Sequence, residues 1–255
     1  MPDFSSSVEN LQLQRGVGTS TNGAGAFGAS LNLLTDAISE KPYADVSLSG
    51  GSYNTFRSHA KFSTGRINDH IEIAGRLSMI KSDGYVDRAW SDLKSYFLQG
   101  SYVDDNTLIK AITFGGVEET YQAWNGVTAE DLENDRTKNY YTYENEIDHY
   151  NQDHYQLHWN QTYNDNWSSN VALHYTYGRG YYEQFKEEED FADYGFDPIV
   201  IGGETIDQTD IIRRKWLDND FFGTTFSVIY NNNEDFNLTV GGAWNKYKGD
   251  HFGEV

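Results

Sequence analysis

Three glycines near the N-terminus have a spacing that many nucleotide-binding enzymes use. Gly23, Gly25 and Gly28 form the pattern G-x-G-x-x-G, which is the dinucleotide fingerprint. That fingerprint requires a helix directly after the glycines, so that the pyrophosphate can lie on the helix N-terminus within a parallel β-α-β unit. Here a short strand-like stretch follows, with Pro42 soon after it. The spacing therefore does not predict a nucleotide site, and we expect no cofactor.

Possible metal ligands gather at residues 149–158. His149, Asp153, His154 and His158 have the side chains that bind transition metals. On a strand, however, His154 and His158 would share one face at a separation of about 13 Å, which is too far to share an ion directly. We expect inward-facing strand or loop residues here and no metal, with a structural metal site as the alternative.

A third set of residues with possible chemistry is aromatic. Exposed rings stack on flat small molecules or sugars, and nearby carboxylates favour a cationic ligand. The alternative is that these rings only fold their own segment. The set lies among acids and amides in a long stretch without strand pattern, and comprises Tyr121, Trp124, Tyr140, Tyr141 and Tyr143.

Whole-chain properties exclude several classes of protein. A net charge of -20 argues against nucleic acid as a partner, because phosphate binding needs clustered Lys and Arg. The sequence contains no nucleophile elbow and no spaced carboxylate pair, so it indicates no enzyme. A run of about 18 apolar residues is also absent, which excludes a membrane-spanning helix. A mean hydropathy of -0.69 still allows a transmembrane β-barrel, in which only every second strand residue faces lipid.

From Ala44 onward, apolar and polar residues alternate in one stretch after another, as in antiparallel strands. In the clearest stretch, Ile71, Ile73, Leu77 and Met79 share one face, while the other face carries polar residues such as Arg76. Lys110 falls among apolar residues, which leaves the register of its strand open. The nine predicted strands are Ala44–Tyr53, Thr55–Thr64, His70–Ile80, Tyr96–Val103, Leu108–Val117, His154–Tyr163, Asn170–Tyr177, Phe222–Tyr230 and Phe236–Trp244.

The connections between these strands alternate in length. Tight Asn/Asp-rich turns at 66–69, 104–106, 164–166 and 231–235 separate long segments at 83–92, 119–151 and 183–208. A membrane barrel with short periplasmic turns and long extracellular loops has this alternation, whereas a soluble sandwich has no reason for it. Aromatic residues crowd the short turns, as in the interfacial girdle of membrane barrels, although cross-strand pairing in a soluble sheet is the alternative. These aromatics are Tyr102, Tyr163, Trp167, Tyr230 and Phe236.

The first 43 residues differ in kind from the rest. A short strand pattern ends in Arg15-Gly16, a passage of glycines and other small residues follows, and residues 29–35 return to a strand pattern that contains Asn32. This order resembles the end of the plug domain of TonB-dependent receptors, in which a strand ending in Arg-Gly, a glycine-rich turn region and a final Ile-Asn-Ile-Ile-Thr-type strand lead into the barrel. The residues that match this motif are Arg15, Gly16, Gly23, Gly25, Gly28 and Asn32.

Two positions depart from the family pattern: Ala29 stands where a second glycine is usual, and Ser30 where an apolar β-branched residue is usual. Residues 216–223 and 241–247 also resemble barrel segments of such receptors from Bacteroidetes. The resemblance covers essentially the whole chain and is strongest at 8–35 and 211–253. If residues 1–43 lie in a lumen, Arg15 could pair with an inner-wall carboxylate such as Glu72, with a plain exposed loop as the alternative.

The resemblance implies an all-β fold: an antiparallel transmembrane β-barrel at residues 44–255, preceded by the C-terminal part of a plug domain with its linker at 1–43. It further implies a receptor and active transporter in the bacterial outer membrane that takes up a scarce nutrient, such as an iron-siderophore, haem, cobalamin or a glycan. The implied partners are outer-membrane lipid, a small-molecule or oligosaccharide ligand, and TonB as the energy source.

The chain also leads us to expect a fragment or a mis-started reading frame. Residues 1–4 have neither the basic region nor the apolar core of a secretory signal. In the family, the segment that contacts TonB lies upstream of the plug portion matched here. Nine strands are also too few to enclose a plug, which takes about 22. Two rivals stay open: a passive outer-membrane porin or adhesin, and a soluble acidic carbohydrate-binding β-protein.

Overall fold

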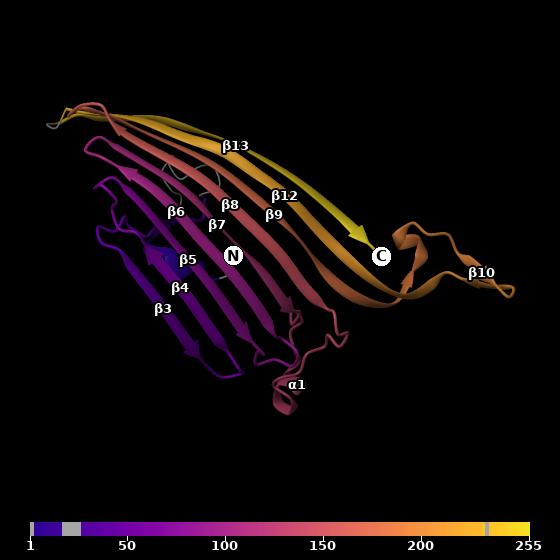
Figure 1. Cartoon of the computed structure of the whole chain (residues 1–255). Coiled ribbons are helices and arrows are strands. Elements are labelled where there is room, and N and C mark those ends of the chain that lie inside the picture. Colours follow the sequence, from indigo (N-terminus) through magenta and orange to yellow (C-terminus); the bar gives the residue numbers. More distant parts are fainter. Residues whose placement is uncertain (1–2, 17–26, 233–234) are drawn as a thin grey trace.

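One antiparallel sheet of nine strands makes up most of the chain (Figure 1). The computed structural model describes residues 3–16, 27–232 and 235–255. The sheet order is β13-β12-β9-β8-β7-β6-β5-β4-β3, and β10 and β11 form only a small separate hairpin. Consecutive strands of the large sheet are therefore neighbours throughout, which is the up-and-down order of a barrel wall.

The strands of the large sheet lengthen from 8 residues in the first two to 24 in β9 and β12, and the last one has 18. The large sheet consists of β3 (Tyr43–Gly50), β4 (Phe56–Ser63), β5 (Ile71–Ser82), β6 (Ser91–Val103), β7 (Thr107–Tyr121), β8 (Ile147–Thr162), β9 (Trp167–Asp190), β12 (Gln208–Asn231) and β13 (Asn237–Glu254). Outside it lie η1 (Phe4–Ser7), β1 (Val8–Arg15), β2 (Ala29–Thr35), α1 (Ala129–Asn134), η3 (Phe191–Tyr194), β10 (Ile199–Ile201) and β11 (Glu204–Ile206). Among the residues described, no helix is long and apolar enough to cross a membrane.

The nine predicted strands are confirmed, but several extend further than predicted. β8 begins at Ile147 instead of His154, and β9 continues to Asp190, into the long connection predicted at residues 183–208. The predicted alternation of connections also holds. The tight turns lie at one end of the sheet, while α1 and the β10–β11 hairpin belong to long connections at the opposite end (Figure 1).

The two faces of the sheet differ in polarity, and the apolar face is the exposed one, which is the opposite of a sheet in a soluble protein. On β5, Ile71, Ile73 and Leu77 are 47%, 43% and 67% exposed, whereas Glu72 and Arg76 between them are 1% and 2% exposed. We call the face with the exposed apolar side chains the outer face and the other the inner face. A sheet folded in water would bury the apolar side instead. This pattern is that of a wall with hydrocarbon outside and polar contacts inside.

The inner face also carries the small hydrophobic core. Phe97 and Ile112 are buried together with Phe114, and Phe4 of η1 packs against them from the N-terminal segment. Lys110 pairs with Ser101 and His158 in the register of its neighbours. The apolar side of β7 that contains Lys110 is thus the inner one, and its apolar residues are covered by the N-terminal segment.

Candidate functional site

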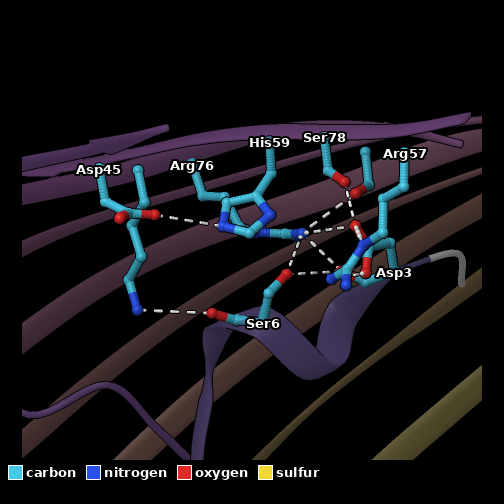
Figure 2. Close-up of polar contacts among 9 residues, drawn as sticks. Asp3, Ser6, Asp45, Arg57, His59, Arg76 and Ser78 are labelled. Atoms are coloured by element: carbon cyan, nitrogen blue, oxygen red, sulfur yellow. Dashed lines mark hydrogen bonds and ion pairs between the residues drawn. The ribbon is translucent and has the colours of Figure 1, made fainter. Parts of the chain in front are cut away.

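The N-terminal segment is anchored to the inner face through Asp3 (Figure 2). Arg57 donates to both oxygens of the Asp3 carboxylate, at 3.2 Å from Nε and 2.7 Å from one terminal nitrogen. Ser78 also donates to this carboxylate, and Arg76 donates to the Asp3 carbonyl and, at 2.9 Å, to the Ser6 hydroxyl. Three residues on β4 and β5 therefore hold one acid from a distant part of the chain.

This arrangement fixes the charge on Asp3. Burial alone would raise the pKa of its carboxyl, but hydrogen bonds from Ser78 and Arg57 and the positive charges of Arg57 and Arg76 outweigh that effect and lower the pKa. The Arg76 side chain is fully buried, and that of Asp3 is 6% exposed. A buried guanidinium needs such a partner, since leaving it unpaired costs several kcal/mol.

A second contact ties the linker after β2 to the same wall. The Ser39 backbone N–H donates to Glu72 at 2.8 Å, and the Ser63 hydroxyl donates to the same carboxylate oxygen at 2.6 Å. Lys61 and Asp36 form an ion pair at 2.7 Å. The predicted possibility that Arg15 pairs with Glu72 is wrong, because Glu72 is held by serine donors and Arg15 is exposed.

The predicted plug motif forms an antiparallel hairpin of β1 and β2. Asn32 pairs with Gln12 in its register, and the Gly16 N–H donates to the Gly28 carbonyl at 2.9 Å. Gly16 has a φ of +80°, a conformation that favours glycine. The other two glycines of the motif, Gly23 and Gly25, lie outside the described residues.

The five predicted loop aromatics fall into two groups. Tyr121 belongs to the end of β7 and is 5% exposed, and its hydroxyl donates to the Tyr143 carbonyl at 2.7 Å. Tyr143 in turn donates to Glu183 at 3.1 Å. These two residues fold the loop, as does Tyr141, whose carbonyl accepts from Arg88.

Trp124 and Tyr140 keep open ring surface, at 52% and 41% exposed. Trp124 packs edge-on against Tyr182 with 5.3 Å between the ring centroids. The Tyr140 hydroxyl donates to Asp131, which also accepts from Lys138. The hydrogen bonds from Lys138 and Tyr140, with one from Thr128, hold the pKa of Asp131 far below its usual range. These two residues are the most exposed of the predicted set.

A recess on the inner face was not predicted. It lies across β8, β9, β12 and β13. Its volume is about 510 Å³ and its lining residues are Tyr150, Gln152, His154, Thr176, Gly178, Asn219, Phe221 and Tyr247.

The histidines of β8 do not come together as ligands. His154 stacks on Phe114 with 4.4 Å between centroids and is 2.9 Å from the Thr176 hydroxyl, while His158 is 3.1 Å from the Gln156 amide oxygen. In the part of the chain that the structure describes, no group of three or more His, Cys, Asp or Glu is placed to hold a metal.

Comparison with solved structures places this fold among outer-membrane receptors. The ferric-catecholate import receptor Fiu of E. coli K12 matches with a TM-score of 0.69 and 12% identity over 94% of this chain. The siderophore receptor PiuA of Acinetobacter baumannii matches with 0.73 and 14% over 96%. The pyoverdine outer membrane receptor FpvA of Pseudomonas aeruginosa PAO1 matches with 0.60 and 13%, also over 96%.

This chain spans 39%, 36% and 46% of those three receptor chains, respectively. No family model matches the sequence, and no curated protein matches it. The Bacteroidetes-like character suggested by residues 216–223 and 241–247 receives no support from these matches. The similarity in structure at such low identity shows that this chain has the fold of the barrel wall of TonB-dependent siderophore receptors.

Proposed function

We propose that the chain forms wall and plug portions of an outer-membrane receptor that takes up a scarce nutrient with energy supplied through TonB. In this proposal residues 1–43 are the end of the plug and residues 44–255 belong to the barrel. The observation that carries the proposal is the polarity of the sheet, with apolar side chains exposed on the outer face and Glu72, Arg76 and Gln99 buried on the inner one.

Contacts of the N-terminal segment favour this function over a passive porin or an adhesin. A porin leaves its lumen open to water. Here η1 and the Asp36–Ser39 linker occupy the inner face through Asp3, Phe4 and Ser39. A soluble carbohydrate-binding protein is disfavoured because it would expose the polar face.

Spin labelling tests the membrane part of the proposal. The chain has no cysteine, so single cysteines can be labelled without background. In phospholipid vesicles, labels at Leu157 and Leu173 on the outer face should be relaxed by oxygen, which concentrates in hydrocarbon. Labels at Gln156 and His174 on the inner face should not be relaxed by oxygen. Loss of this two-residue periodicity would contradict the proposal.

Uptake tests the receptor part. Cells that carry the gene should accumulate the nutrient only when tonB is intact. Equal accumulation with and without tonB, or ion conductance of the purified protein in planar bilayers, would favour the porin instead. The fold does not identify the ligand, so uptake is measured with two probes, iron-55 complexes and radiolabelled oligosaccharides.

A further inference from the structure

Two tyrosine rings in the inner-face recess lie flat against the wall. A Cβ at Gly178 would come within 2.2 Å of the Tyr150 hydroxyl, and one at Gly180 within 2.6 Å of the Tyr150 ring. A Cβ at Gly249 would come within 2.3 Å of the Tyr247 hydroxyl. The glycines thus leave room that the rings occupy. Each ring is backed by main chain, so its other side is available for stacking.

Amide groups surround these rings. Gln152 pairs with Gly116 on one side and Gly178 on the other, so its side chain has no bulky neighbour in register. Asn219 accepts from the Tyr247 hydroxyl at 2.6 Å through its oxygen, which leaves its amide N–H groups directed elsewhere. Among the described residues, the Gln152 side chain has no hydrogen bond. Donors and acceptors thus stand beside a stacking surface.

The recess has no Asp, Glu, Lys or Arg among its lining residues. The adjoining recess, which shares Tyr150, contains Glu118, Asp148 and Lys215. An anionic complex would approach two carboxylates and one ammonium group there, and would find no cation in the recess itself. Flat rings, amides and the lack of charge are together suited to a neutral ring that carries hydroxyl groups.

We propose that this recess binds a neutral sugar ring, which stacks on Tyr150 or Tyr247 and hydrogen-bonds to Gln152 and Asn219. The inference rests on the proposed function, in which the inner face lines the uptake path. It goes further by assigning a site and a class of ligand, namely a neutral oligosaccharide in place of an anionic ferric complex.

The test is binding of neutral trisaccharides to the full chain. Maltotriose, cellotriose, laminaritriose and mannotriose are titrated in lauryldimethylamine oxide, because glycoside detergents would compete. Saturation-transfer NMR reports which sugar protons touch the protein. We expect at least one trisaccharide to bind, and at least one of the variants Tyr150→Leu and Tyr247→Leu to weaken that binding about tenfold.

Two more variants sharpen the result. Gly178→Val should also weaken binding, because its side chain displaces the Tyr150 ring without removing it. Tyr175→Leu is the matched control: Tyr175 is adjacent to the recess residue Thr176 but lies on the outer face, so binding should be unchanged. Spectra of each variant in the same detergent establish that the sheet is intact.

Three outcomes would overturn the assignment: no trisaccharide binds, binding is unaffected by both tyrosine variants, or the ferric complex of 2,3-dihydroxybenzoate binds at these residues in place of sugar. None of these would contradict the receptor function, which fails only if the spin-label periodicity or the dependence on tonB fails. The two proposals are therefore distinguishable.

Discussion

Replacing Leu173 by arginine provides the sharpest test of which face meets the membrane. Leu173 lies on the outer face, is 48% exposed, and follows the turn-end aromatic Trp167 by six residues. Six residues rise about 20 Å along a strand, or about 15 Å along the membrane normal at a tilt of about 40°. Because the apolar band is about 25 Å tall, Leu173 lies near its middle, where arginine costs about 2 to 4 kcal/mol.

The neighbouring His174→Arg supplies the comparison. His174 faces inward, 2.9 Å from the Asn245 amide oxygen and 4.9 Å between ring centroids from Phe221. Its replacement removes one hydrogen bond and one ring contact, for which we expect about 1 kcal/mol. Leu173→Met controls for packing alone and should cost less than about 1.5 kcal/mol.

The assay is reversible unfolding by denaturant in phospholipid bilayers, followed by tryptophan fluorescence. The measured quantity is the difference in unfolding free energy between the two arginine variants, in which the effects common to both arginine side chains cancel. Equal losses, or a larger loss at position 174, would refute the assignment of faces and with it the membrane interpretation of the sheet.

Three further predictions concern the N-terminal anchor and the first long loop. Asp3→Asn should weaken docking of residues 3–7 by about 3 kcal/mol, because the buried Arg76 loses its counter-charge. Hydrogen exchange of that segment should then be faster, and an unchanged exchange rate would contradict the prediction. Docking lowers the pKa of Asp3, so the stabilisation is present above the unfolded pKa of about 3.9 and is lost as the pH falls through the lower docked value. Docking should therefore hold at pH 5 to 8 and weaken below about 4. In Asp3→Asn this pH dependence should vanish. Arg88→Met should make the loop at residues 122–146 more sensitive to protease, since Asn139 and Tyr141 lose their guanidinium donor, and an unchanged cleavage rate would argue against this role.

The strand pattern was predictable because it depends on alternation that a sequence displays directly. All nine strands of the sheet were found, and the face assignment of Ile71, Ile73 and Leu77 agrees with their exposure. The strand ends were not predictable, since both faces are polar beyond the apolar band and the alternation stops there. Residues 147–153 of β8 are an example, with the order Ile-Asp-His-Tyr-Asn-Gln-Asp.

The contacts that position the N-terminal segment could not be predicted from the local sequence pattern. Asp3 bonds to residues 54 and 75 positions away, and nothing around it distinguishes it from other acids in this acidic chain. Tyr121 was placed in a loop because β7 loses its alternation before that residue. The recess depends on glycine and tyrosine meeting across strands, which requires the register.

The inverted polarity has a consequence for how such a chain diverges over time. Side chains on the outer face need only be apolar, so leucine, valine, isoleucine and phenylalanine can replace one another there with little loss of stability. Inward positions change mainly in concert with whatever the lumen holds. Sequence identity at these positions can therefore fall while the architecture is kept, which fits solved structures of 12% to 14% identity that still match more than nine-tenths of this chain.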